Sequence, residues 1–166
     1  MSNAIDVRLI LERFPYGVFV VATTSPEGEV LGILATWVTQ VSFEPPLIAV
    51  SVETGGNFGQ ALGRSGQFSL NLLRSGDLRL AREILKSGPR LEEHGARKEF
   101  MIAPGGTPVL QESAGALLCR VTQMHEAGDH QLIVAEVTGG FDSQGMESMT
   151  LRETGWKYRR KNSLNP

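Results

Sequence analysis

The hydrophobic positions of this chain fall in short runs that turn residues separate. Residues 5–13 carry apolar side chains at helical spacing and stop before a proline, which predicts a short leading helix. Residues 16–24 are rich in β-branched and aromatic side chains and predict a strand. Ser25-Pro26-Glu27-Gly28 supplies a turn, and a second strand is predicted from Val30 up to the proline pair at 45–46.

The middle of the chain predicts two more strands and two helices. Residues 47–52 form an apolar run and predict a third strand. A short helix around residues 58–62 is expected to end at Gly63 and Gly66, because glycine terminates helices. Residues 67–73 alternate apolar and polar side chains, which predicts a half-buried strand. Asp77 is placed to cap a helix that runs to Lys86.

The last third is again rich in strands. Residues 90–107 predict a long surface excursion, and residues 116–124 and 131–137 predict a hairpin with shorter strands after it. Many strands with few, short helices indicate a mainly β fold, an antiparallel barrel or sandwich. The expected organisation is one domain over residues 1–166, with a leading helix at 1–13 and a C-terminal tail at 150–166.

Composition narrows the function classes. The chain has 166 residues, 41% hydrophobic, with a net charge of −2, which favours neither nucleic acid nor an anionic membrane as a partner. A single cysteine, Cys119, excludes an internal disulfide framework and predicts a reducing, cytoplasmic location. No run is long enough to predict a membrane span.

Several chemical motifs are incomplete. His125 and His130 in HEAGDH are one residue too far apart for the HExxH zinc motif, and they lie in a hairpin connection. The pairs Gly55-Gly56 and Gly105-Gly106 complete neither nucleotide-binding glycine motif. Cys119 lies within an apolar strand and is expected to fill the core. These observations argue against a metal site and against hydrolase chemistry.

A row of short polar side chains remains, just before the proline break, in ATWVTQVS at residues 35–42. Hydroxyls, amides and strand-end N–H groups can bind phosphate oxygens and the rim of a heteroaromatic ring, and Trp37 can lie along such a ring. The residues alone leave two alternatives open: a cofactor site, or a β-barrel interaction module without a cofactor.

An ordered set of segments resembles one known family. These segments are FPYGVFVV with Thr23-Thr24, Gly28 and Gly32, ATWVTQVSFEPPLIAVSV, GQFSLNLL, and GDH followed by AEV. They resemble the flavin reductase-like, FMN-binding split-barrel family, which includes flavoredoxins and NAD(P)H:flavin oxidoreductases, over residues 14 to about 140. The resemblance implies an antiparallel Greek-key split barrel, a homodimer, and FMN, or FAD in its place, near the subunit interface.

The resemblance also assigns candidate site residues. The segment that lines the flavin and its phosphate corresponds to Ala35, Thr36, Trp37, Val38, Thr39, Gln40 and Ser42. Ser51 and Thr54 match positions near the phosphoryl tail. The family often places a basic residue directly before a phenylalanine in the surface excursion, and Arg97 or Lys98 is the corresponding candidate for phosphate. The order of Ala96-Arg97-Lys98-Glu99-Phe100 departs from that pattern. The resemblance also makes an aromatic residue near the C-terminus, Trp156 or Tyr158, a candidate cover for the flavin of the partner subunit. His130 matches the histidine that faces isoalloxazine and nicotinamide, and it is the predicted catalytic residue.

This resemblance explains why the polar row contains no strong acid or base. A flavin performs the redox chemistry, while the protein binds and orients it. The resulting hypothesis is an NAD(P)H-dependent flavin oxidoreductase in which hydride passes to flavin N5. Two alternatives stay open: a flavoredoxin-like electron carrier that uses a redox partner protein, and a non-enzymatic flavin-binding module.

Overall fold

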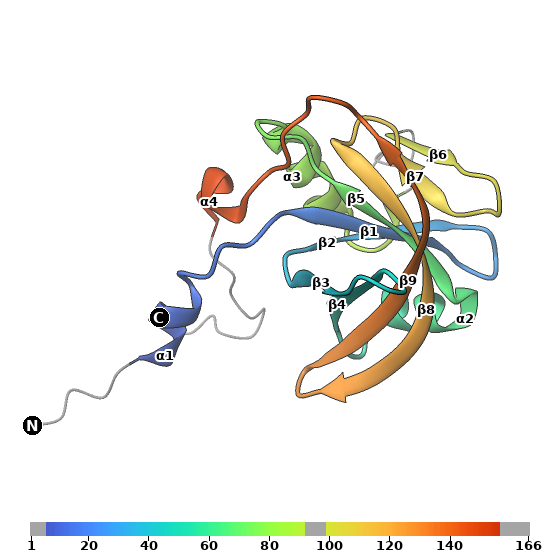
Figure 1. Cartoon of the computed structure of the whole chain (residues 1–166), viewed down its shortest axis with the longest axis horizontal. Coiled ribbons are helices and arrows are strands. Elements are labelled where there is room, and N and C mark those ends of the chain that lie inside the picture. Colours follow the sequence, from blue (N-terminus) through green and yellow to red (C-terminus); the bar gives the residue numbers. More distant parts are fainter. Residues whose placement is uncertain (1–5, 92–98, 157–166) are drawn as a thin grey trace, which may run out of the picture.

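The computed structural model describes residues 6–91 and 99–156, and a strongly bent antiparallel sheet is its main element (Figure 1). The strands are β1 (Phe19–Thr24), β2 (Val30–Ala35), β3 (Val38–Ser42), β4 (Leu47–Glu53), β5 (Gln67–Leu72), β6 (Phe100–Ile102), β7 (Pro108–Leu110), β8 (Gly115–Ala127) and β9 (His130–Asp142). The helices are α1 (Val7–Leu11), α2 (Asn57–Ser65), α3 (Leu78–Ser87) and α4 (Leu151–Thr154). The predicted mainly β, split-barrel fold is confirmed.

The seven-stranded sheet has the order β2-β1-β5-β8-β9-β4-β3. Its two edge strands, β2 and β3, follow one another in the chain and are joined by Thr36 and Trp37 alone. A link of two residues brings the two edges together, so the sheet curls into a barrel. The sequence predicted one continuous strand here, which is wrong, because the chain leaves one edge of the sheet at Ala35 and enters the other at Val38.

Two apolar clusters hold the fold. The first fills the barrel, where Phe68, Ile133 and Val50 are each at most 1% exposed, and Leu62 on α2 packs into it. The second lies on the outer side of β1 and β2, and it includes Leu80 and Ile84 of α3. Asp77 accepts the N–H of Leu80, so the predicted cap of α3 is confirmed.

Strand β5 is buried on both faces, not on one as its alternating sequence predicted. Ser69 and Asn71 are fully buried, like the apolar residues between them. The small β6–β7 sheet covers this face: the Ser69 hydroxyl donates to the carbonyl of Pro108, and Asn71 accepts the N–H of Leu110 at 2.9 Å. The polar side chains therefore join two sheets instead of facing water.

Other boundaries also differ from the sequence prediction. Helix α2 continues through Gly63 to Ser65, and Gly66 ends it with a φ of +67°. The β8–β9 hairpin extends well beyond its predicted bounds. The start of the predicted C-terminal tail forms α4, whose Thr150 makes a capping box with Glu153.

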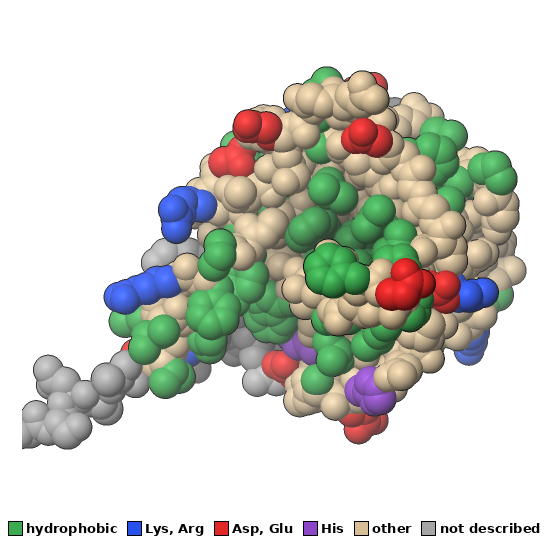
Figure 2. All heavy atoms as spheres, in the orientation of Figure 1, with side chains coloured by type: hydrophobic (Ala, Val, Ile, Leu, Met, Phe, Trp, Pro, Cys, Tyr) green, Lys and Arg blue, Asp and Glu red, His purple; other side chains and the backbone are tan. Residues whose placement is uncertain are grey.

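Helix α1 forms within the predicted range but buries none of its residues. It projects from the barrel in Figure 1, and its apolar side chains gather on an exposed surface in Figure 2. The exposed apolar residues of this arm are Val7, Leu9, Ile10, Leu11 and Phe14. A helix of five residues is not stable by itself in water, so this surface calls for a packing partner.

Candidate flavin site

Three segments that are distant in sequence meet at one end of the barrel. The first is the β2–β3 link with Thr36 and Trp37, the second is the end of β4, and the third is the β8–β9 turn. The N–H of Ser51 donates to the carbonyl of Trp37 at 3.0 Å. The N–H and the hydroxyl of Thr54 both donate to the carbonyl of Asp129, each at 3.0 Å. These bonds fix the three segments relative to one another.

An aromatic pair forms the centre of this region. The rings of Trp37 and His130 lie 4.7 Å apart between centroids, at an interplanar angle of 46°. The His130 side chain is only 8% exposed, and its Nδ1 lies 2.6 Å from Oδ1 of Asp129. We call Thr36, Trp37, Ser51, Thr54, Asp129 and His130 the Trp37–His130 site.

The turn before His130 has a local cause. Ala127 pairs with His130 across the hairpin, so the loop contains only Gly128 and Asp129. Gly128 has a φ of +67°, a conformation that glycine adopts without strain. The short turn places the Asp129 carboxylate beside the ring of the next residue.

Thr36 carries an unsatisfied buried group. Its hydroxyl is inaccessible to water and finds no hydrogen-bond partner among the described residues. Burying a hydroxyl without a partner costs on the order of 1–3 kcal/mol, so such a group in a folded protein calls for an explanation. A ligand that bonds to this hydroxyl would supply one.

The remaining residues of the polar row do not gather here. Ala35 is buried in the barrel core, and Val38 packs against that core. Thr39 and Gln40 are exposed further along β3, where the Gln40 amide donates to the carbonyl of Ser42 at 3.1 Å. Their predicted contact with flavin stays a prediction. Arg97 and Lys98 lie outside the described residues.

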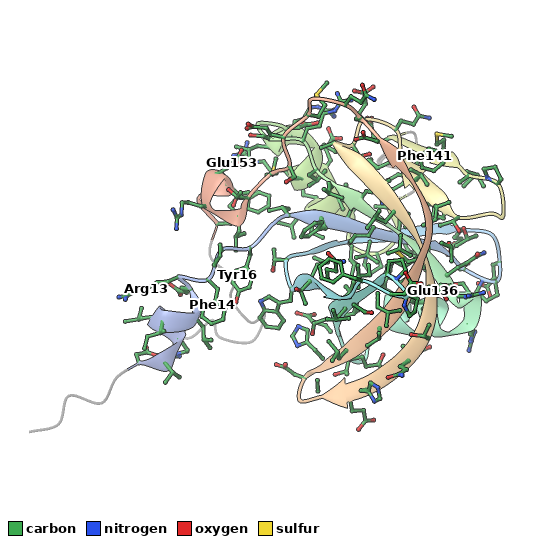
Figure 3. The ribbon with its side chains drawn as sticks, in the orientation of Figure 1. Arg13, Phe14, Tyr16, Glu136, Phe141 and Glu153 are labelled. Atoms are coloured by element: carbon green, nitrogen blue, oxygen red, sulfur yellow. The ribbon has the colours of Figure 1, made fainter. Side chains whose placement is uncertain are left out.

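A cleft of about 1120 Å³ opens beside Trp37. Trp156, one of the two aromatic residues predicted to cover the flavin, lines the same cleft, which also has Met149 in its wall. The other, Tyr158, lies outside the described residues. The opposite wall is the arm that precedes β1, where the rings of Phe14 and Tyr16 lie 6.1 Å apart (Figure 3). The sequence analysis did not assign these two residues to a site, although two aromatics flanking a proline were a visible signal.

The start of α2 is a second feature that the sequence analysis missed. Its N-cap is Gly56, which makes no side-chain capping bond, and Gly55 before it has a φ of +85°. A Cβ added at either glycine would meet no atom within 4 Å. Unbonded N–H groups at a helix N-terminus attract anions, and this one follows directly after Thr54. The glycine pair was set aside because it completes no nucleotide motif, yet its position is suited to a phosphate.

Cys119 does not contribute to this site. It is 2% exposed in the barrel core, as predicted, and burial raises the pKa of its thiol to about 12. The thiol is therefore protonated at neutral pH and is not a nucleophile. Among residues 6–91 and 99–156, no three His, Cys, Asp or Glu side chains are grouped closely enough to hold a metal ion.

The fold is that of a split barrel, and the comparisons with known proteins identify the family. Residues 11–157 match the family model of the flavin reductase like domain. The chain therefore belongs to this family. Over 133 residues it is 34% identical to the Flavin reductase (NADH) of Kitasatospora aureofaciens, which covers 79% of this chain and 68% of that protein.

Two further relatives extend the comparison. Diflavin flavoprotein A 1 of Synechocystis sp. is 29% identical over 157 residues, a match that covers 92% of this chain but only 27% of the longer protein. The structure of the NADH:FAD oxidoreductase SgcE6 of Streptomyces globisporus, in complex with NAD and FAD fragments, has a TM-score of 0.80 at 22% identity. That match covers 99% of this chain and 100% of the other, and at this identity it shows a shared fold.

In the described part of the chain, no helix combines the length and the apolar character needed to cross a bilayer.

Proposed function

We propose that the chain is an FMN-binding flavoprotein that oxidises NAD(P)H and transfers the electrons to flavin. The observation that carries this proposal is the partnerless Thr36 hydroxyl beside the Trp37–His130 ring pair. A flavin held here would give that hydroxyl a hydrogen-bond partner, and Trp37 would offer an aromatic surface to its ring system. The reducing cytoplasm stays the location that we propose.

The residues present fit FMN along its length. Thr36 and Trp37 would hold the ring system, and the start of α2 would hold the phosphate through N–H groups that no side chain caps. The bonds from Ser51 to Trp37 and from Thr54 to Asp129 connect these two ends. FAD would use the same contacts for its FMN half. When bound, the flavin supplies the atom that accepts hydride.

His130 is the proposed catalytic residue, because its ring lies against Trp37 and is almost fully buried. A buried imidazole can hydrogen-bond the carboxamide of a nicotinamide and hold it in the orientation for hydride transfer. Exclusion of water around the ring pair strengthens such a bond.

The proposal is tested by anaerobic mixing of the FMN-loaded protein with NADH and, separately, with NADPH. Rapid loss of the visible absorbance of the flavin is the expected result with at least one of the two. An absorbance that stays unchanged with both nucleotides would contradict the oxidoreductase assignment. Reoxidation by air, which restores the colour, is the control for reversible reduction.

A second candidate function is that of an electron carrier that receives electrons from another protein. It is favoured by the match to a segment of Diflavin flavoprotein A 1, since the chain corresponds to about a quarter of that protein. The same mixing experiment separates the two candidates: a carrier keeps its colour with NADH and NADPH and loses it with dithionite.

Replacement of Thr36 by valine tests the ring contact. Because the hydroxyl has no partner in the protein, its removal should leave the stability of the flavin-free protein unchanged or slightly higher. The affinity for FMN should fall by about 5- to 10-fold, which corresponds to roughly 1 kcal/mol for one hydrogen bond. Fluorescence titration with FMN and urea unfolding measure the two quantities. An unaltered dissociation constant would place the flavin elsewhere.

We also propose that two copies of the chain form a homodimer. Large apolar side chains are exposed at the tip of the β3–β4 hairpin, where Phe43 is 87% and Val41 51% exposed, and Phe141 on β9 adds to them. Together with the α1 arm, these side chains make more apolar surface than an isolated subunit would leave in water (Figure 2). Homodimer interfaces bury such surface.

Phe43→Asp should weaken this dimer. An apolar anchor in an interface contributes at least about 2 kcal/mol, so the dimer dissociation constant should rise by roughly 30-fold or more. Leu85→Asp is the matched control, because Leu85 is also exposed, at 60%, on the distant helix α3. Sedimentation velocity measures the effect, and equal behaviour of both variants would remove Phe43 from the interface.

A further inference from the structure

We propose that a groove between α2 and the β1–β2 turn holds the adenylate half of FAD, and that the chain therefore binds FAD more tightly than FMN. This assignment rests on the proposed function, because it starts from a flavin phosphate at the beginning of α2. FAD is FMN with an adenylate joined to that phosphate. The contacts described above account only for the FMN half, and the groove is a place for the other half.

The groove begins where the flavin phosphate is proposed to lie. It is a cavity of about 160 Å³, and its α2 wall is formed by Asn57, Gln60, Ala61 and Arg64. These residues are three or four positions apart, so they share one face of the helix. Asn57 is the first residue of α2 and follows the N-cap Gly56. From Asn57 to Arg64 the helix axis advances about 10 Å, which is comparable with the length of a nucleoside.

The opposite wall of the groove is the β1–β2 turn, which is held by its own hydrogen bonds. The Ser25 hydroxyl oxygen accepts the N–H of Glu27 at 3.2 Å and the N–H of Glu29 at 3.3 Å. The N–H of Ser25 donates to the carbonyl of Glu29 at 2.9 Å. Ser25 and both glutamates line the groove, so this wall is formed before any ligand binds.

The two walls carry charges of both signs. Arg64 and Arg90 place guanidinium groups at the groove, and Glu27 and Glu29 place carboxylates there. A hydrogen bond with Ser25 holds the pKa of Glu27 below its usual range, and the charge of Arg64 contributes to this shift. Glu27 is therefore ionised at neutral pH. A small anion alone would be repelled by the carboxylates, which argues against a simple phosphate site.

An adenylate can use each of these groups. A carboxylate accepts hydrogen bonds from ribose hydroxyls, and a guanidinium can lie over the face of adenine or pair with the second phosphate. The side-chain amides of Asn57 and Gln60 can bond to the edge of the base. Sites for whole drug-sized ligands measure about 300–1,000 Å³, so this smaller groove suits one part of a larger molecule.

Titration calorimetry of the flavin-free protein with FMN and with FAD tests the assignment. The wild type should bind FAD at least about tenfold more tightly, the gain expected from a few exposed contacts. Arg64→Ala should weaken FAD binding by about fivefold or more and FMN binding by less than about twofold. Arg82→Ala is the matched control, because it removes the same charge from an exposed position on α3 and should leave both affinities unaltered.

NADH also contains an adenylate, so its KM is measured with the same variants. Arg64→Ala should leave the KM for NADH unchanged. A raised KM for NADH together with an unaltered affinity for FAD would assign the groove to the nicotinamide nucleotide and would overturn the assignment to FAD. Equal affinities of the wild type for FMN and FAD, or an FAD preference that Arg64→Ala and Arg82→Ala both retain in full, would overturn it as well.

The proposed function and the groove can fail separately. A wild-type protein that binds neither flavin, or that oxidises neither NADH nor NADPH when loaded with flavin, removes the proposed function. A wild-type protein that oxidises NADH with FMN bound but shows no preference for FAD removes only the adenylate groove.

Discussion

Replacing His130 by alanine should lower kcat/KM for NAD(P)H by about 100-fold, the effect of losing a group that orients a substrate for reaction. The dissociation constant of FMN should change much less, because Thr36 and the start of α2 remain. The side chain of His130 is nearly buried against Trp37, so its removal should change the place proposed for the nicotinamide ring. Steady-state kinetics with NADH and FMN fluorescence titration give the two numbers.

His125→Ala is the matched control for this experiment. His125 lies in the same hairpin, but its side chain is exposed. Its Nε2 lies 3.0 Å from the side-chain oxygen of Gln123, on the same strand. It should behave like the wild type. Equal turnover by His130→Ala and the wild type would leave His130 the role of a residue that fastens the β8–β9 turn.

Much of the fold could be predicted because local sequence patterns determine where its strands, turns and helices begin and end. The β1–β2 hairpin, β4 and the helix capped by Asp77 follow from turn residues, β-branched runs and capping chemistry. The closure of the barrel could not be predicted in this way. Residues 30–42 read as one strand, and nothing local shows that its two halves lie on opposite edges of the sheet.

The candidate site was located in part. The polar row led to Thr36 and Trp37, and the resemblance led to His130, which the structure places against Trp37. The sequence could not show that the Thr36 hydroxyl is buried without a partner, because that depends on residues far away along the chain. Phe14 and Tyr16 were not assigned to the site, because residues 5–13 were interpreted only as a short leading helix and Tyr16 as the start of a strand.

The second main error of the sequence prediction concerns the polar face of β5, on which Asn71 lies. Replacement of Asn71 has the largest expected effect on stability. The alternation of β5 predicted that Asn71 faces water, but the β6–β7 sheet covers it and leaves it fully buried. Its amide donates to the carbonyl of Val20 at 3.0 Å, and its oxygen accepts the N–H of Leu110 at 2.9 Å. This one side chain therefore connects β1 of the barrel to β7 of the small sheet.

Asn71→Ala should destabilise the protein by roughly 3–5 kcal/mol, because it leaves buried backbone groups without a partner and also creates a cavity. Urea unfolding of the flavin-free protein measures this loss. Gln60→Ala on α2 removes an exposed amide and should change the free energy of unfolding by less than about 0.5 kcal/mol. A similarly small effect of Asn71→Ala would mean that water replaces the lost amide. Apolar contacts, such as those of Phe100 and Leu110 in the second apolar cluster, would then hold the two sheets together.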